Sequence, residues 1–223
     1  MGDDRGKQDK TTIFLLKSGD YRYDNIKRFI GHADLRLNDK GRAQAAGWRQ
    51  ELIHLPLQRI FCSDLSRSHE TACILAEGSR VPVLPLPRLR EINLGGWDGQ
   101  SIADVRRLYP HEYEKRGTEM AYYRPPGGEC FADMAARVIP LFENLVREAS
   151  GDLLIVGHSG VNKVILCHIL GMPLDNLFRL RQDYACLNVI ENNKGGMQLR
   201  LINARSWRAQ SSDQSCQEGR AEC

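Results

Sequence analysis

The chain has 223 residues, of which 42% are hydrophobic and 26% are charged, and a formal net charge of +3. This composition predicts a soluble globular protein with no nucleic-acid or membrane partner, because the charge is too small and the apolar runs are too short to span a bilayer. The seven cysteines are odd in number and show no Cys-x-x-Cys spacing, which predicts reduced thiols and no metal site in a cytoplasmic protein.

The polar ends of the chain predict a flexible leader over residues 1–11 and a disordered tail over residues 208–223, with a single domain over residues 12–207 between them. Short apolar runs within this domain predict strands, and 3.6-residue periodicity with capping signals predicts helices. In chain order the predicted elements are strand 12–17, a helix capped at Asn38 or Asp39 and ending at Leu52, strand 59–63, helix 66–77, strand 81–84, a long helix over 131–146, strand 152–157, helix 161–170, and a hairpin of strands 185–191 and 197–203.

Strands that alternate with helices predict an α/β fold, with a mostly parallel sheet that is covered by helices on both faces. In such sheets, ligands bind beyond the carboxyl ends of the strands. Three predicted strands end in chemically useful residues. These strand ends are Lys17-Ser18-Gly19, Ser63 to Arg67 and Gly157 to Gly160. The pattern therefore predicts that Lys, Ser, Arg and His side chains meet at one edge of the sheet.

Each candidate site residue has a simpler interpretation beside the functional one. Arg67 falls in the first turn of a helix, where a guanidinium group and the helix N-terminus both favour an anion; its simpler interpretation is a surface arginine in a helix salt bridge. His158 is followed by Ser159-Gly160 and preceded by Gly157 at a strand-to-helix turn, which indicates close approach of a ligand, although a core or capping histidine is the common alternative. Glu91 suits a general acid, but its spacing is equally typical of a surface acid paired with a neighbouring arginine. Arg28 is either a pocket residue or a solvated loop charge.

Taken in order, these motifs resemble the histidine phosphatase superfamily, in the branch that includes cofactor-dependent phosphoglycerate mutases and alpha-ribazole phosphatases. The resemblance runs from about residue 12 to residue 203 and is nearest in pattern to small phosphatases of the alpha-ribazole phosphatase type. It implies a phosphoglycerate mutase-like, three-layer α/β/α sandwich. The motifs include Leu15-Leu16-Lys17-Ser18-Gly19-Asp20, Arg28-Phe29-Ile30-Gly31, Leu89-Arg90-Glu91, Pro126-Gly127-Gly128-Glu129 and Val156-Gly157-His158-Ser159-Gly160.

The resemblance also implies roles for the site residues. It makes Arg67 and Arg28 the pocket arginines, His158 the second histidine and Glu91 the acid, with no metal and no other cofactor. The family's nucleophilic His falls on Ser18 and its neighbouring Arg on Lys17. A Ser hydroxyl is a poor nucleophile without an adjacent base or a metal. The ammonium group of Lys is a point charge, and it cannot form the two parallel hydrogen bonds that an Arg guanidinium makes to a phosphate. Asp24 replaces the family's loop Asn and adds negative charge near the approach to the phosphate.

The sequence therefore predicts a pocket for a small phosphoester, made by Lys17, Arg28, Arg67 and His158, in a protein whose phosphatase activity is lost or strongly reduced. Two alternatives stay open. One is an active phosphomonoesterase in which Ser18 or His158 attacks phosphorus, and the other is a non-catalytic protein-interaction module. We expect a small phosphorylated molecule as the ligand and a lid formed by residues 101–123. The oligomeric state is not predicted.

Overall fold

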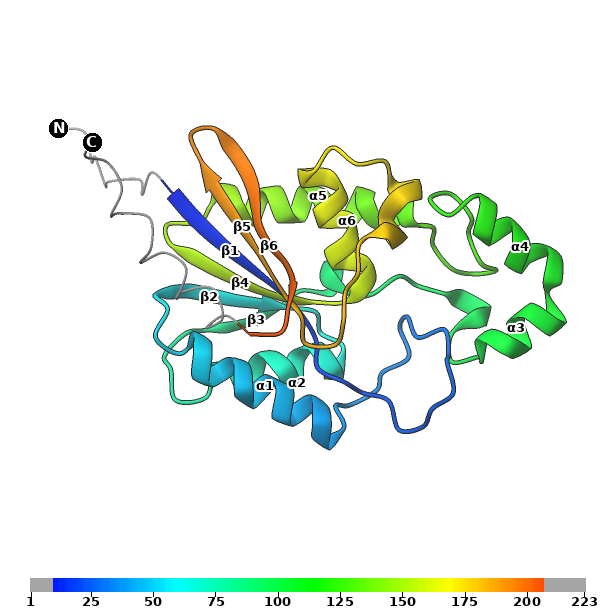
Figure 1. The fold of residues 1–223 in the computed structure, drawn as a ribbon, viewed down its shortest axis with the longest axis horizontal. Helices are drawn as coiled ribbons and strands as arrows, with labels where there is room; N and C mark the ends of the chain where they lie inside the picture. Colours follow the sequence, from blue (N-terminus) through cyan, green and yellow to red (C-terminus); the bar gives the residue numbers. More distant parts are fainter. Residues whose placement is uncertain (1–9, 207–223) are drawn as a thin grey trace, which may run out of the picture.

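The central element of the structure, a computed structural model that describes residues 10–206, is a six-stranded sheet with the strand order β3-β2-β4-β1-β5-β6 (Figure 1). β1 to β4 run parallel to one another, β5 runs antiparallel to β1, and β6 runs antiparallel to β5. The prediction of a mostly parallel sheet is confirmed. The strands are β1 (Lys10–Lys17), β2 (Leu57–Cys62), β3 (Val83–Pro85), β4 (Asp152–Gly157), β5 (Leu187–Asn193) and β6 (Gly196–Ala204).

Helices cover both faces of this sheet, so the three-layer α/β/α sandwich is confirmed as well. One face packs on α1 (Asp39–Leu52) and α2 (Ser66–Ala76), and the other packs on α5 (Phe131–Arg147) and α6 (Ser159–Ile169) (Figure 1). Two short helices, α3 (Ile102–Leu108) and α4 (Pro110–Thr118), lie beyond the carboxyl ends of the strands. The 3-10 segments are η1 (Pro87–Leu89), η2 (Gly95–Trp97) and η3 (Leu174–Arg179).

The alternation of side chains along β1 divides the core into two parts. Ile13 and Leu15 belong to the cluster under α5 and α6, whereas Phe14 and Leu16 belong to the cluster under α1 and α2. All four residues are at most 2% exposed, as expected for a central strand that is covered on both faces. β1 is therefore rigidly held, and the residues that follow it are placed accurately.

The observed elements differ from the predicted ones mainly at their ends. β1 begins at Lys10, inside the predicted leader, because Lys10 and Thr11 pair with β5. α6 begins at Ser159, two residues before the predicted start, with His158 as its N-cap. The remainder of the predicted leader and the predicted tail lie outside the described residues.

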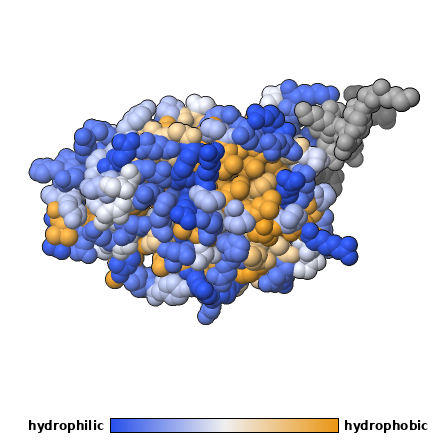
Figure 2. All heavy atoms as spheres, turned by 180° about the vertical axis from the view of Figure 1, so that it is seen from behind, coloured by the Kyte–Doolittle hydropathy of each residue, from blue (hydrophilic) through white to orange (hydrophobic). Residues whose placement is uncertain are grey.

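The surface on the face shown in Figure 2 is mostly hydrophilic and contains one continuous apolar area. Most large apolar side chains are instead packed in the two core clusters, as hydrophobic burial requires. Within residues 10–206, no helix is both long enough and apolar enough to cross a bilayer.

Candidate functional site

The carboxyl ends of β1, β2 and β4 meet at one place, as the strand pattern predicts. Lys17 pairs with Gly157 in the parallel register of β1 and β4, and the N–H of Ser18 donates to the carbonyl of Gly157 at 3.0 Å. Ser18 and His158 therefore lie next to each other, each directly after one of these two adjacent strands. The Ser68 hydroxyl donates to the carbonyl of Val156 at 2.7 Å, which anchors the first turn of α2 at the same edge. The structure thus brings Ser18, Arg67 and His158 together.

This cluster is fully buried and contains polar atoms without protein partners. Ser18, Arg67 and His158 are 0%, 1% and 2% exposed. Ser18 Oγ, Arg67 Nε and His158 Nε2 have no hydrogen-bond partner, and Asn162 Oδ1 is the only other such side-chain atom among residues 10–206. Because nearly all buried polar atoms in proteins are paired, three unpaired atoms in one cluster indicate a site that is built for a polar ligand.

Arg67 is held by the loop that follows β1. Its Nη1 donates to the carbonyl of Ala33 at 2.8 Å and its Nη2 donates to the carbonyl of Gly31 at 2.7 Å. The ring of Tyr21 lies 4.9 Å from the guanidinium carbon. Each terminal nitrogen therefore uses one N–H on the chain, and Nε has no partner and can donate to a ligand. The alternative of a surface arginine in a helix salt bridge is wrong.

His158 is uncharged at neutral pH in this environment. Burial lowers its pKa well below the usual 6.5, and the positive charges of Arg67 and Lys17 lower the pKa further. A bound anion would oppose these two charges and raise the pKa again. The neutral ring offers either a donor or a lone pair at Nε2.

Lys17 points away from Ser18, as the alternation of a strand requires. Its Nζ donates to the carbonyl of Gln182 at 3.1 Å and lies 3.9 Å from the ring centroid of Tyr184. Burial lowers the pKa of this ammonium group to about 8. The residue therefore adds positive charge close to the cluster, but its described contacts are with the loop that precedes β5.

Glu91 is buried and is held by backbone amides. It is 8% exposed, its Oε2 accepts from the N–H of Gly160 at 3.0 Å, and its Oε1 accepts from the N–H of Ile92 at 2.9 Å. The alternative of a surface acid paired with Arg88 or Arg90 is wrong, since Arg90 pairs with Asp64 at 2.6 Å. Glu91 thus contacts the first turn of α6, which begins directly after His158 in the chain.

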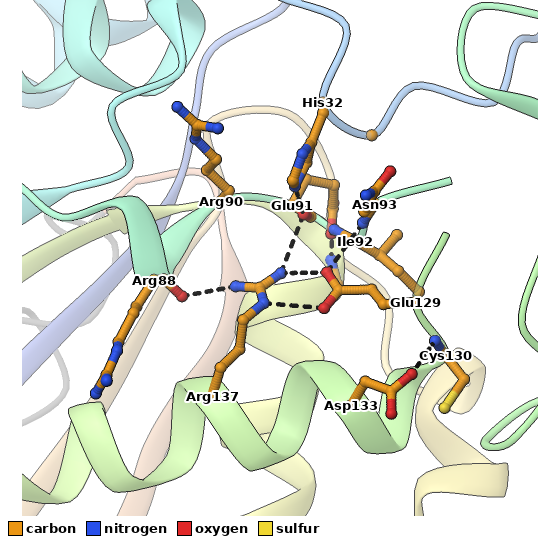
Figure 3. A network of polar contacts seen from close by, with 12 residues as sticks. His32, Arg88, Arg90, Glu91, Ile92, Asn93, Glu129, Cys130, Asp133 and Arg137 are labelled. Carbon is orange, nitrogen blue, oxygen red and sulfur yellow. Dashed lines mark hydrogen bonds and ion pairs between the residues drawn. The ribbon is translucent and has the colours of Figure 1, made fainter. Parts of the chain in front are cut away.

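A second polar network fixes the backbone around Glu91 (Figure 3). Arg137, on α5, donates to the carbonyl of Glu91 at 3.1 Å and to the carbonyl of Arg88 at 2.6 Å. The same guanidinium forms two hydrogen bonds with the carboxylate of Glu129, at 2.6 and 3.1 Å. Glu129 in turn accepts from the N–H of Asn93 at 2.9 Å. The Pro126 to Glu129 motif is therefore an anchor for the segment that carries Glu91.

Arg28 is not brought into the cluster. Its Nη2 pairs with Asp24 at 3.2 Å, its Nη1 donates to the carbonyl of Gly99 at 3.3 Å, and its side chain is 37% exposed. Among the described residues, Arg28 forms no hydrogen bond or ion pair with Arg67 or His158. Its place in a phosphate pocket stays a prediction, and Asp24 already neutralises its charge.

Three residues of the site were missed by the sequence analysis. Tyr21 and Tyr184 contact each other edge to face, with ring centroids 5.2 Å apart, and no sequence pattern signals that contact. Lys163 is 8% exposed, and burial lowers its pKa while the carboxylate of Glu91 opposes that shift. Its spacing of three residues after Gly160 places it on the same face of α6, which is a signal that could have identified it.

The predicted lid, residues 101–123, contains α3 and α4. Arg116 of α4 lies 5.2 Å from the ring of Phe29 and 5.8 Å from the ring of Phe178. These contacts seat α4 near Lys163, whose Nζ lies 4.2 Å from the same Phe178 ring. A covering role for this segment stays a prediction. Among the described residues, no group of three or more His, Cys, Asp and Glu side chains is arranged to hold a metal ion.

Residues 13–205 match the sequence profile of the histidine phosphatase superfamily (branch 1). The chain is 31% identical over 200 residues to an adenosylcobalamin/alpha-ribazole phosphatase of Salmonella typhimurium, a match that covers 88% of this chain and 98% of that protein. It is 32% identical over 177 residues to a glucosyl-3-phosphoglycerate phosphatase of Mycolicibacterium vanbaalenii, with 74% and 76% covered. The crystal structure of the alpha-ribazole phosphatase from Shigella flexneri superposes with a TM-score of 0.81 at 25% identity, over 88% of this chain and 98% of that one.

Proposed function

The chain belongs to the histidine phosphatase superfamily (branch 1), and we propose that it binds the phosphate group of a small phosphoester at Ser18, Arg67 and His158 but hydrolyses it slowly or not at all. The observation that carries the binding proposal is the set of three buried, unpaired polar atoms at the ends of three strands. Arg67 Nε and, as donors, the Ser18 hydroxyl and His158 Nε2 would each bond to a phosphate oxygen.

The proposal of weak catalysis rests on Ser18, which the resemblance between the motifs aligns with the nucleophilic His of the family. Its Oγ donates to no base: His158 Nε2 and Ser18 Oγ are both unpaired, so the two do not form the nucleophile–base pair that activates a hydroxyl. Lys17, the other candidate base nearby, has its Nζ at Gln182 and Tyr184. A bound phosphoester would then be held without an activated attacking group.

The proposed ligand is a small phosphomonoester. Two of the relatives are named adenosylcobalamin/alpha-ribazole phosphatase and glucosyl-3-phosphoglycerate phosphatase. These names support the class of ligand without selecting one compound for this chain.

The decisive experiment compares the protein with a Lys17→Arg, Ser18→His double variant on p-nitrophenyl phosphate and a panel of small phosphoesters. We expect activity only in the double variant, and loss of that activity when Arg67→Ala is added. Inorganic phosphate should raise the melting temperature of the unmodified protein, as ligand linkage requires. Turnover by the unmodified protein that disappears in Arg67→Ala would contradict the proposal.

The alternative of an active phosphomonoesterase is favoured by one observation. His158 is uncharged, and its Nε2 is unpaired, so in the tautomer that carries the proton on Nδ1 the Nε2 lone pair is free to attack phosphorus. Rapid acid quench and mass spectrometry would find a phosphoryl adduct on His158 or Ser18 if this alternative holds. If phosphate leaves the melting temperature unchanged and no adduct forms, the protein-interaction module becomes the better proposal.

A further inference from the structure

A cavity of about 570 Å³ lies between α1 and the loop over residues 182–185. Its volume falls in the range of sites for small molecules. Lys17 lines it, whereas Ser18, Arg67 and His158 do not. The cavity is therefore distinct from the buried cluster. The lining residues that carry the argument are Lys17, Arg22, Lys40, Gln44, Trp48 and Tyr184.

The walls of this cavity are held in place by contacts within the chain. The indole N–H of Trp48 donates to the carbonyl of Ala185 at 2.6 Å. The ring of Tyr184 lies against two cations, with Lys17 Nζ at 3.9 Å and the guanidinium carbon of Arg22 at 4.8 Å. Gln44 accepts from the backbone N–H of Asp20 at 2.9 Å. A cavity with walls that are already formed loses little ordering entropy when a ligand binds.

Two of the three carboxylates in the lining are already paired with arginines. Asp20 forms an ion pair with Arg22 at 2.6 Å, and Asp183 forms one with Arg205 at 2.8 Å. The third carboxylate, Glu51, accepts from the hydroxyl of Ser206 at 3.3 Å.

The two lysines of the lining are not balanced in this way. Lys40 is exposed and forms no ion pair with another described residue, and Lys17 has a carbonyl oxygen as its hydrogen-bond partner. Because Asp20 and Asp183 are neutralised by their arginines, the charges that remain in the lining are the two ammonium groups of Lys17 and Lys40 and the one carboxylate of Glu51. The cavity therefore carries net positive charge and favours an anion.

Two tyrosine rings separate this cavity from the buried cluster. Tyr184 lines the cavity, its ring contacts the ring of Tyr21, and Tyr21 lies on the guanidinium of Arg67. A molecule in the cavity would meet Tyr184 and Lys17 and would have no direct contact with Arg67. Binding at the two places can thus be measured separately.

We propose that this cavity is a second anion-binding site, which takes a small organic molecule with a carboxylate or phosphate group. Lys17 and Lys40 bind the anionic group, and Tyr184 packs against the organic part. Phosphate and carboxylate share the chemistry that these ammonium groups recognise. The site does not depend on whether the cluster around Ser18 binds phosphate or performs catalysis.

The test follows the indole N–H signal of Trp48 by nuclear magnetic resonance, assigned with Trp48→Phe, while the whole protein is titrated with inorganic phosphate and, separately, with citrate. Concentrations up to about 10 mM fill most of a millimolar site. We expect at least one anion to shift the signal. Lys40→Glu should weaken that binding by about tenfold or more, whereas Lys115→Glu, an equal charge change on α4, should leave it unchanged.

The variant Arg67→Ala separates this site from the buried cluster, and it should keep the Trp48 shift. A response to citrate alone identifies a carboxylate site, and a response to phosphate alone identifies a phosphate site. The proposal is overturned if neither anion shifts the Trp48 signal, if Lys40→Glu binds as well as Lys115→Glu, or if Arg67→Ala abolishes the shift.

Discussion

Glu91 accepts a hydrogen bond from the backbone N–H of Gly160 at 3.0 Å, and this contact ties the carboxylate to the first turn of α6. The approach is so close that a Cβ atom at position 160 would lie 2.2 Å from Glu91 Oε1. Any other residue at position 160 must therefore displace Glu91 or the start of α6. The position of the proposed acid depends on the absence of a side chain at Gly160.

Gly160→Ala is expected to lower the free energy of unfolding by about 1–3 kcal/mol, the usual effect of overpacking a buried site. It should also weaken phosphate binding, because the start of α6 carries His158. Urea unfolding and phosphate titration measure the two effects. Gly117→Ala is the matched control, since a Cβ there meets nothing within 4 Å; equal stability of the two variants would refute the close approach.

Tyr21→Ala is expected to strengthen phosphate binding by about three- to tenfold. The ring of Tyr21 lies on the guanidinium of Arg67, and a cation–π contact of about 1 kcal/mol competes with an anion for that group. Binding is measured by calorimetric titration with inorganic phosphate. The measured protein also carries Lys40→Glu, which weakens binding in the proposed cavity site, so the titration reports on the buried cluster. Tyr122→Ala removes a ring that is 69% exposed and serves as the control. Weaker binding in Tyr21→Ala would instead make Tyr21 part of the phosphate site.

The sequence was sufficient to predict which strand ends converge, because parallel strands that follow apolar runs place their carboxyl ends at one edge of a sheet. Ser18 and His158 are neighbours for that reason. The boundaries were less predictable: β1 extends to Lys10 through pairing with β5, and no periodicity in a polar segment signals such a pairing.

The contacts that decide what the site residues do were not predictable from single motifs. Arg67 donates to the carbonyls of Gly31 and Ala33, and Tyr21 contacts Tyr184 from more than 160 positions away in the chain. These contacts depend on how the loops fold over the sheet edge, and local propensity carries no information about that. Arg28 is an example, since its place in a motif predicts a pocket residue, whereas its side chain contacts Asp24 and the carbonyl of Gly99.

Arg137 and Glu129 are expected to be energetically coupled. Their side chains are 22% and 17% exposed, and the guanidinium bonds both carboxylate oxygens as well as the carbonyl of Glu91 (Figure 3). A double-mutant cycle with Arg137→Met and Glu129→Gln should give a coupling energy of about 1–3 kcal/mol. The exposed pair Arg107 and Asp104, at 69% and 54% exposure, should give less than about 1 kcal/mol. Similar values for both pairs would argue against an anchoring role.

Lys17 should make stability depend on pH in the alkaline range. Burial lowers its pKa from the ordinary 10.5 to about 8. Below pH 8 both the folded and the unfolded chain hold the proton, so the folded state bears the whole desolvation penalty. Between pH 8 and 10.5 the unfolded chain binds more protons, and the contribution of this group to stability therefore rises with pH.

Lys17→Met removes that titration. The free energy of unfolding of the variant minus that of the unmodified protein should be largest below pH 8 and should fall by up to about 3 kcal/mol as the pH rises to 10.5. Urea unfolding at several pH values measures this difference, and the loss of the contact with Gln182 only adds a constant. Lys115→Met, at an exposed position on α4, should show a difference that does not change with pH. A flat profile for Lys17→Met would mean that the ammonium group is well solvated in the folded protein and that burial does not lower its pKa.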